Sequence, residues 1–248
     1  MRKGAICMRY TAVSHVGEVR SVNEDRYLAR EEDDGRALLL AVSDGMGGEA
    51  AGDLAAETVV EYLEDVPMQG LDNPGRLAAH VQDINELIHK LVQDNPNLAG
   101  MGATLTAAYV SANHAAWVHV GDSRLYLMRG EELMRITRDQ RFIQEFIDHG
   151  ELTEEQARSH PLRSMLDQSV GSPEVEPVTG TLDLQPGDVL LICSDGLHDL
   201  VSEQDIAARL RALRSENPPD LDRCAHDLVE AAREAGGHDN VTLVLAFI

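Results

Sequence analysis

Two long apolar runs stand out in the pattern of hydrophobic and polar positions. Residues 37–42 and residues 189–193 are almost continuously apolar, and each run ends at a Ser-Asp-Gly sequence, centred on Asp44 in the first and Asp195 in the second. A continuous apolar run of this length favours a strand that is buried on both faces. The sequence therefore predicts two core strands, each closed by a Ser-Asp-Gly turn at the edge of the core.

Helix-like spacing occurs in two pairs of segments. Residues 50–64 are rich in Ala and Glu with apolar residues at helical intervals, and Asn73 followed by Pro74 is typical of a helix start. Two more helices are predicted at 202–213 and 220–235. In the helix that follows Pro74, one apolar stripe is expected to face the core: Leu77, Val81, Ile84, Leu87, Ile88 and Leu91.

Strand-like segments separated by polar breaks fill much of the remaining chain. Residues 104–110, 115–120 and 125–128 predict an antiparallel meander, and residues 241–248 predict a final strand. Strands and helix pairs come in blocks, whereas a doubly wound parallel sheet needs a βαβ alternation. The pattern predicts an α+β fold with antiparallel sheets, and the length favours a single domain over residues 1–248.

Composition and charge exclude several classes of protein. Hydrophobic residues make up 43% of the chain, as in soluble globular proteins, and no apolar run approaches the roughly 20 residues of a membrane helix. No secretory apolar region follows the start of the chain, which favours a cytoplasmic location. The formal charge of -22 and the dispersed arginines argue against a nucleic-acid partner. The acidic excess indicates either solubility alone or carboxylates that cluster to hold cations.

Four aspartates lie in Gly- or Asn-containing breaks beside predicted strands: Asp44, Asp122, Asp195 and Asp239. Any one of them alone is typical of an Asx-turn. Together they favour a cation site, because ionised carboxylates at the edge of a core repel one another unless cations neutralise them. Oxygen ligands without clustered His or Cys suit Mg²⁺ or Mn²⁺ better than Zn²⁺.

Five short motifs resemble the ordered motifs of the protein phosphatase 2C family in its bacterial form. They are Arg20-x-x-Asn23-Glu24-Asp25, Asp44-Gly45-Met46-Gly47-Gly48, Gly121-Asp122-Ser123-Arg124, Ser194-Asp195-Gly196 and Gly237-His238-Asp239-Asn240-Val241-Thr242. Each motif is weak alone, but five in this order across nearly the whole chain are specific. The resemblance implies a four-layer α-β-β-α sandwich, in which helix pairs flank two antiparallel sheets and a metal centre lies at one end between the sheets.

The resemblance also implies a set of metal ligands for two Mn²⁺ or Mg²⁺ ions. Asp44 would bridge the two ions, and Gly45 would contribute its backbone carbonyl. Asp195 and Asp239 would hold one ion, and Glu24 would act largely through a bound water.

Three further residues receive roles from the resemblance. Asp122 matches a position that helps to hold a third, weaker metal ion in bacterial relatives, Asp25 would support the ligands, and Arg20 would grip the substrate phosphate. A guanidinium suits that task because its fork of N–H donors binds phosphate in two places. The implied reaction is attack on phosphorus by a water that the two metal ions activate.

The chain departs from the family pattern where a proton donor is expected. Animal members place a histidine directly after the first Asp-Gly, but this chain has Met46 there. His160 and a metal-bound water are the candidate donors to the leaving group.

The polar segment of about 137–171 corresponds to the variable flap of the family. It contains a capping-box pattern, Thr153-x-x-Gln156. Its arginines at 141, 158 and 163 are interpreted either as contacts to a phosphopeptide or as solvated charges. Residues 165–171 lack the arginine that is common there in the family.

The leading hypothesis is a monomeric bacterial-type phosphatase that hydrolyses phosphoserine and phosphothreonine in phosphoprotein substrates and opposes a serine/threonine kinase. One alternative acts on a phosphorylated regulator of the anti-sigma-antagonist type, which changes the partner and not the chemistry. A second alternative is a pseudophosphatase that binds phosphoproteins without hydrolysis. A metal-dependent nuclease is disfavoured because no cationic surface is indicated for a polyanion.

Overall fold

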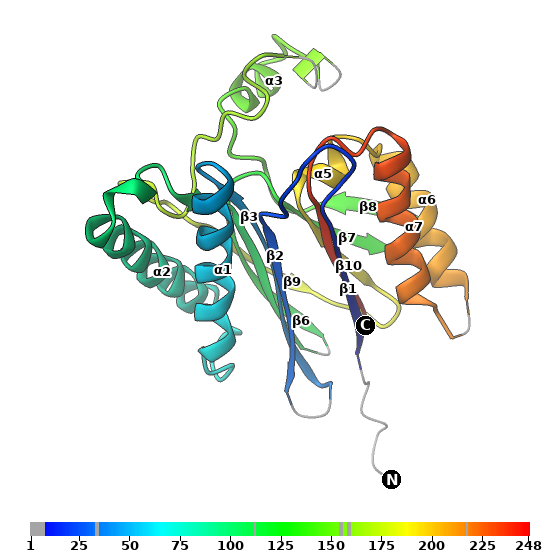
Figure 1. The fold of residues 1–248 in the computed structure, drawn as a ribbon. Helices are drawn as coiled ribbons and strands as arrows, with labels where there is room; N and C mark the ends of the chain where they lie inside the picture. The colour runs from blue at the N-terminus through cyan, green and yellow to red at the C-terminus, as the bar shows by residue number, and fades with distance from the viewer. Residues whose placement is uncertain (1–7, 33–34, 112, 154–155, 158–159, 217) are drawn as a thin grey trace.

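A computed structural model describes residues 8–32, 35–111, 113–153, 156–157, 160–216 and 218–248. Two antiparallel sheets pack face to face, and a pair of helices covers the outer face of each sheet, which makes four layers (Figure 1). The predicted α+β sandwich of the α-β-β-α type is therefore confirmed. Among the helices of the described ranges, none has the length and apolar character that crossing a membrane requires.

The two sheets contain strands from all parts of the chain. In spatial order, the first sheet consists of β1 (Arg9–His15), β11 (Val241–Phe247), β10 (Val189–Cys193), β7 (Arg124–Arg129) and β8 (Glu132–Arg135). The second consists of β2 (Asp25–Glu32), β3 (Ala37–Met46), β5 (Leu105–Ser111), β6 (His114–Val120) and β9 (Val178–Asp183), and the short β4 (Gly102–Ala103) pairs with the end of β3. The first and last strands of the described chain therefore meet in the first sheet, where β1 pairs with β11.

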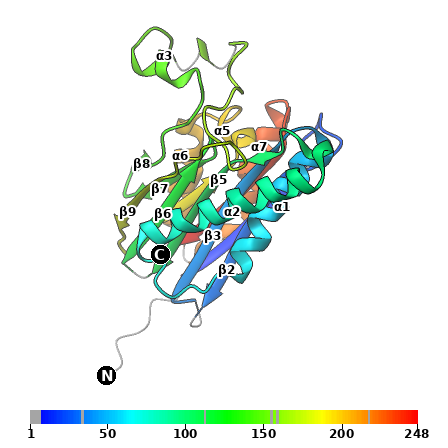
Figure 2. The ribbon, with the colours of Figure 1, turned by 90° about the vertical axis from the view of Figure 1, so that its left-hand side faces the viewer.

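The helices cover the sheets in the pairs that the sequence predicts. The helices α1 (Glu49–Asp65) and α2 (Pro74–Asp94) lie across the second sheet (Figure 2), and α6 (Glu203–Ser215) and α7 (Leu221–Glu234) pack on the first. Short helical segments in the described ranges include η1 (Pro96–Leu98), α3 (Gln144–Asp148) and α5 (Asp195–His198).

Strand β3 explains why the run 37–42 is continuously apolar. Leu38 and Leu40 pack between the two sheets, whereas Leu39 and Ala41 pack under the helices. Because successive side chains of a strand point to opposite faces, a strand between two apolar layers needs apolar residues at every position.

The predicted stripe on α2 is correct at most of its positions and wrong at one. Leu77, Val81, Ile84 and Ile88 are buried, whereas Leu87 is 38% exposed. The buried positions follow steps of four and three residues, and Leu87 lies about 100° around the helix from Ile88, outside that stripe.

The predicted meander is wrong at its third strand. Strands β5 and β6 pair as expected, but β7 belongs to the other sheet, so the chain crosses between the sheets at residues 121–123. Gly121 permits this crossing because its φ is +102° and a Cβ there would lie 2.7 Å from the side chain of Thr104. The crossing places Asp122 at the end of the sandwich.

The two predicted Ser-Asp-Gly turns are not turns in the structure. Strand β3 continues through Asp44, which pairs with Asp25, and the chain bends only at Gly47 and Gly48, which have positive φ. Asp195 is the first residue of α5. The two aspartates therefore stand at a strand end and a helix start.

The segment 137–171 extends beyond the end of the sandwich and carries α3 (Figure 1). Isolated β-bridges between Arg141 and Leu166 and between Ala103 and Val170 fasten its base. The predicted capping box is confirmed, because the Thr153 N–H donates to Gln156 Oε1 at 2.8 Å and the Gln156 N–H donates to Thr153 Oγ1 at 3.2 Å. Arg158 lies outside the described residues.

Candidate metal centre

A cleft of about 330 Å³ lies at the end of the sandwich, where segments of both sheets meet the flap. The segments from the sheets include the start of β2, the end of β3, the crossing from β6 to β7, the junction of β10 with α5, and the start of β11, and the flap contributes Ser164 and Leu166. The cleft is lined by seven of the predicted site residues: Arg20, Glu24, Asp44, Gly45, Asp122, Asp195 and Asp239. The structure thus brings together residues that lie far apart in the sequence.

Hydrogen bonds to Thr104 fix the backbone around Asp44. The Asp44 N–H donates to Thr104 Oγ1 at 3.0 Å, and the Thr104 N–H donates to the Asp44 carbonyl at 2.8 Å. The Ser43 hydroxyl also donates to the Thr104 carbonyl at 2.8 Å. Since all these groups are near the core, their pairing makes the end of β3 a rigid support for the Asp44 carboxylate.

Asp25 joins the two sheets beneath the cleft. Its Oδ2 accepts a hydrogen bond from the Ser194 hydroxyl at 2.7 Å, and Ser194 also bonds to the backbone of Thr242. Asp25 Oδ1 is buried and accepts no hydrogen bond from the described residues. Burial is the main reason why the pKa of Asp25 is raised to about 6. Asp25 is the partner of Asp44 across the strands, but its carboxylate does not line the cleft.

Close backbone contacts explain the glycine in each Ser-Asp-Gly sequence. A Cβ on Gly45 would lie 2.0 Å from the Gly52 carbonyl oxygen, and a Cβ on Gly196 would lie 1.9 Å from the Asn240 carbonyl oxygen. Any side chain at these positions would force the segments apart. The two glycines thus let α1 approach Asp44 and let the segment of Asp239 approach Asp195.

The carboxylates in the cleft resist ionisation. Burial is the largest cause that raises the pKa values of Asp44 and Asp195 well above the usual value. Neighbouring negative charges raise both values further; the largest of these charges is Asp25 for Asp44 and Asp122 for Asp195. Burial likewise raises the pKa of Asp122 to about 7, although Arg141 opposes the shift. Asp44 and Asp195 keep some exposure to the cleft. A cation in the cleft would relieve this repulsion.

Arg20 lies at the rim of the cleft, in contact with Asp239. The guanidinium donates to Asp239 Oδ2 at 2.8 Å, and the two side chains are 48% and 38% exposed. The bond to Asp239 raises the pKa of Arg20. Both groups can therefore reach a ligand that enters from solvent.

Asn240 holds three segments of the site together, a role that sequence reasoning missed. Its Oδ1 accepts the Glu24 N–H at 2.8 Å, and its amide donates to the carbonyls of Val16 and Val22, both at 2.9 Å. The only sequence signal is its place beside Asp239 in a turn. An asparagine there can satisfy several backbone groups at once.

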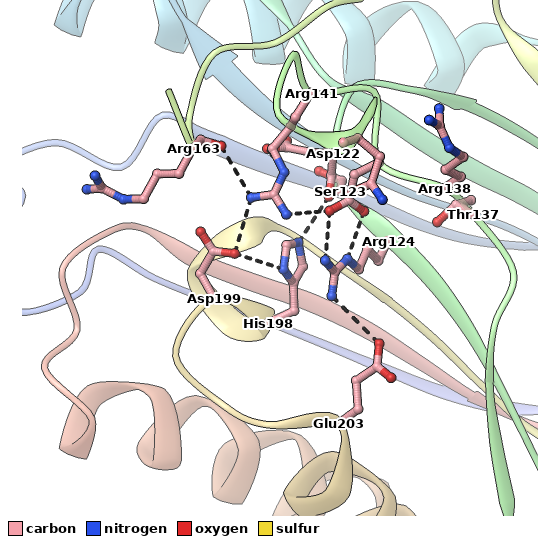
Figure 3. Close-up of polar contacts among 12 residues, drawn as sticks. Asp122, Ser123, Arg124, Thr137, Arg138, Arg141, Arg163, His198, Asp199 and Glu203 are labelled. Carbon is pink, nitrogen blue, oxygen red and sulfur yellow. Dashed lines mark hydrogen bonds and ion pairs between the residues drawn. The ribbon is translucent and has the colours of Figure 1, made fainter. Parts of the chain in front are cut away.

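A buried ion-pair network lies beside Asp122, and it was also missed (Figure 3). Asp139 accepts bonds of 2.8 and 2.7 Å from Arg124 and a further bond from Arg141. Arg141 also pairs with Asp199 at 3.3 Å and lies 3.8 Å from Asp122. Both sequence interpretations of Arg141, a phosphopeptide contact or a solvated charge, are wrong, because its side chain is 7% exposed. The burial of a single arginine in a polar segment produces no periodic hydrophobic pattern from which it could be predicted.

The other residues that the sequence singled out differ in how close they lie to the carboxylates. Met46 lines the cleft but has no proton to donate. His160 is not among the lining residues, and its Nδ1 accepts the Leu162 N–H at 3.2 Å. The Arg163 side chain points away from the buried network (Figure 3), and it lines a neighbouring groove together with Asp195, Asp199 and His238.

The donor set fits a hard divalent cation. Carboxylates and a backbone carbonyl are the ligands that Mg²⁺ and Mn²⁺ prefer. Burial and, after it, neighbouring carboxylates raise the pKa values of Asp44 and Asp195, and a bound cation would favour their ionised form. Within the described ranges, no three His, Cys, Asp or Glu side chains already surround one point closely enough to hold an ion. Ligation would therefore require side-chain rotations within the cleft.

Comparison with known proteins identifies the family to which this sandwich fold belongs. The family described as "Protein phosphatase 2C" matches residues 14–231. The chain therefore belongs to the protein phosphatase 2C family.

Two curated relatives are bacterial protein phosphatases. The serine/threonine protein phosphatase PstP of Mycobacterium tuberculosis is 42% identical over 99% of this chain, and this chain spans 46% of the length of that protein, about half. Protein phosphatase PhpP of Streptococcus pneumoniae is 36% identical, with 96% of each chain covered. A solved structure, the catalytic domain of PstP in complex with two manganese ions, has a TM-score of 0.84 and 40% identity over 97% of both chains.

Proposed function

We propose that this protein is a metal-dependent phosphatase that removes phosphate from phosphoserine and phosphothreonine in proteins. The observation that carries the proposal is the convergence of Asp44, Asp195 and Asp239 on one cleft with Arg20 at its rim. The names of the relatives support the same reaction, and the manganese complex of PstP supports a metal requirement.

In this proposal the carboxylates hold two Mn²⁺ or Mg²⁺ ions. Asp44 would serve both ions, Gly45 would offer its carbonyl, Asp195 and Asp239 would hold one ion, and Glu24 would contribute from the start of β2. When bound, such ions neutralise phosphate charge and make a water nucleophile available near neutral pH. Asp122 would add a third, weaker cation position.

The chain itself orients the substrate. Arg20 pairs with Asp239 at the rim of the cleft, and its guanidinium would offer two N–H donors to phosphate oxygens of the substrate. Asp25 and Thr104 keep Asp44 in place during the reaction. Because Met46 has no proton to donate and His160 does not line the cleft, the leaving alkoxide takes its proton from water.

The partners follow from this chemistry. Phosphoproteins are the proposed substrates, and a serine/threonine kinase that phosphorylates them is the proposed opposing enzyme. We further propose that the chain is one phosphatase domain with a flap over about 137–171. The cytoplasmic location and the monomeric state stay predictions of the sequence.

The test is hydrolysis of a phosphothreonine peptide by protein stripped of metal with EDTA and then supplied with Mn²⁺. We expect phosphate release only with Mn²⁺, and we expect it to disappear in Asp44→Asn and Asp195→Asn. Asp65→Asn is the matched control, because it makes the same change at the exposed end of α1. Peptide binding without turnover would instead indicate a phosphoprotein-binding module, and activity in both cleft variants would refute the metal centre.

A further inference from the structure

Arg141 lies beside the cleft, among three carboxylates. Its guanidinium is buried at the base of the flap and faces carboxylates from three separate elements: Asp122 at the crossing between the sheets, Asp139 at the start of the flap, and Asp199 after α5. Figure 3 shows the Arg141 guanidinium close to Asp122 and Asp199. A cation surrounded by three acidic groups is the arrangement that a bound metal ion also requires.

Asp139 alone does not explain the burial of Arg141. Arg124 already gives Asp139 two hydrogen bonds, and these bonds and the Arg124 charge outweigh burial and hold the pKa of Asp139 below its ordinary value. The Nε–H of Arg141 is buried and has no acceptor among the described residues. This group lies 3.8 Å from Asp122 Oδ2, too far for a hydrogen bond but close enough for a strong ion pair in a buried site.

Asp122 lies between the cleft and Arg141. Its carboxylate lines the cleft together with Asp44 and Asp195, and on its other side it faces Arg141. The nearby His198 does not supply the balancing charge, because burial and the adjacent Arg124 lower its pKa and keep it neutral. Among the described residues, Arg141 forms the ion pair with Asp122, and Arg124 adds a weaker positive charge.

We propose that Arg141 is a built-in counter-ion of Asp122 that competes with a divalent cation for this carboxylate. The proposal rests on the metal centre proposed above, and it concerns the third and weakest cation position only. Because one carboxylate cannot be fully satisfied by both partners, the Arg141 contact lowers the affinity of that position for metal.

The competition links the cation to the flap. The Arg141 backbone bridges to Leu166, and its side chain donates to the Arg163 carbonyl at 3.4 Å, so Arg141 ties the entry of the flap to its exit. A cation that displaces Arg141 from Asp122 removes one of the three carboxylate partners of Arg141. By linkage, a change that moves the flap base away from Asp122 increases the affinity of this position for the cation, and binding of the cation favours that movement by the same factor.

The experiment is a Mn²⁺ titration of the metal-free protein, in which the electron paramagnetic resonance signal of free Mn²⁺ counts the ions bound. We compare the wild type with Arg141→Gln, and with Arg138→Gln as the matched control. Arg138 belongs to the same segment, but its side chain is exposed and pairs with Asp148. We expect Arg141→Gln to bind the weakest class of Mn²⁺ about tenfold more tightly, and Arg138→Gln to match the wild type.

Two further variants make the result decisive. In the double variant Arg141→Gln/Asp122→Asn, the increase in Mn²⁺ affinity is expected to disappear. An increase that survives the second substitution would overturn the proposal. An unchanged isotherm for folded Arg141→Gln would overturn it too. If Arg141→Gln does not fold, Arg141→Lys decides: a lysine cannot reach all three carboxylates, so we expect about threefold tighter binding, and unchanged affinity refutes the competition.

The same titration separates this proposal from the proposed function. If the wild type binds Mn²⁺ tightly and Asp44→Asn abolishes that binding, the metal centre stands whatever Arg141→Gln shows. If the wild type binds no Mn²⁺ at all, the metal centre and the competition both fail.

Discussion

Replacing Gly196 by Ala tests how the cleft is assembled. Gly196 follows Asp195 in α5, and its backbone touches the segment that carries Asp239 and Asn240. A Cβ at this position would lie 1.9 Å from the Asn240 carbonyl oxygen and 2.9 Å from its carbon. Both contacting atoms belong to backbone, so no flexible side chain can move aside.

The expected effect follows from the separation that the new methyl group requires. Relief of the clash needs the two segments to part by roughly 1 Å, at a cost of about 3 kcal/mol for overpacking in a rigid environment. For a protein of this size that loss lowers Tm by about 6–12 °C. A shift of about 1 Å between Asp195 and Asp239 is also expected to reduce kcat/KM about 100-fold.

Calorimetric unfolding and hydrolysis of p-nitrophenyl phosphate with Mn²⁺ measure both effects. Gly150→Ala is the control, because Gly150 lies in the flap, where a Cβ would meet no atom within 4 Å and only the φ of +71° opposes a side chain. We expect Gly150→Ala to cost about 1 kcal/mol without loss of activity. A Gly196→Ala protein with wild-type Tm and activity would refute the backbone contact and the assembly inferred from it.

Three further predictions follow from the site. Arg20→Gln is expected to lower kcat/KM for a phosphothreonine peptide about 10- to 100-fold through loss of a charged hydrogen bond, and an unchanged steady-state rate would exclude Arg20 from phosphate binding. EDTA is expected to abolish hydrolysis and excess Mn²⁺ to restore it, as measured by phosphate release; activity that persists in EDTA would contradict the metal requirement. In metal-free protein, folded Asp25 has a pKa of about 6 against an ordinary value of 3.8, so it keeps a proton that the unfolded chain loses between these values. Its contribution to the free energy of unfolding therefore falls by about 3 kcal/mol as pH rises from about 3 to about 7. Urea unfolding of the wild type minus that of Asp25→Asn is expected to show this fall, and a flat difference would contradict it.

The hydrophobic pattern was sufficient to predict the layers but not the connections between them. The run 37–42 must be buried on both faces, and the stripe on α2 must face a sheet, so the sandwich follows from local periodicity. The sheet to which residues 124–129 belong is not a local property. It depends on Gly121, whose positive φ lets the chain cross between the sheets.

The acidic residues of the site were predictable and the groups that support them were not. Asp44, Asp195 and Asp239 stand beside apolar runs in recognisable motifs. Arg141 lies in a polar segment where burial leaves no pattern, because its partners come from three separate elements. Asn240 acts through backbone groups, which no side-chain motif reveals.

The most direct test of the central claim is an anomalous difference map from a crystal of this protein soaked in Mn²⁺ and recorded at the manganese absorption edge. We predict two strong peaks in the cleft, one in contact with both Asp44 and Asp195 and both within reach of the Asp44 carboxylate. A cleft without anomalous density, or peaks at Asp44 and Asp195 that share no ligand, would contradict the account.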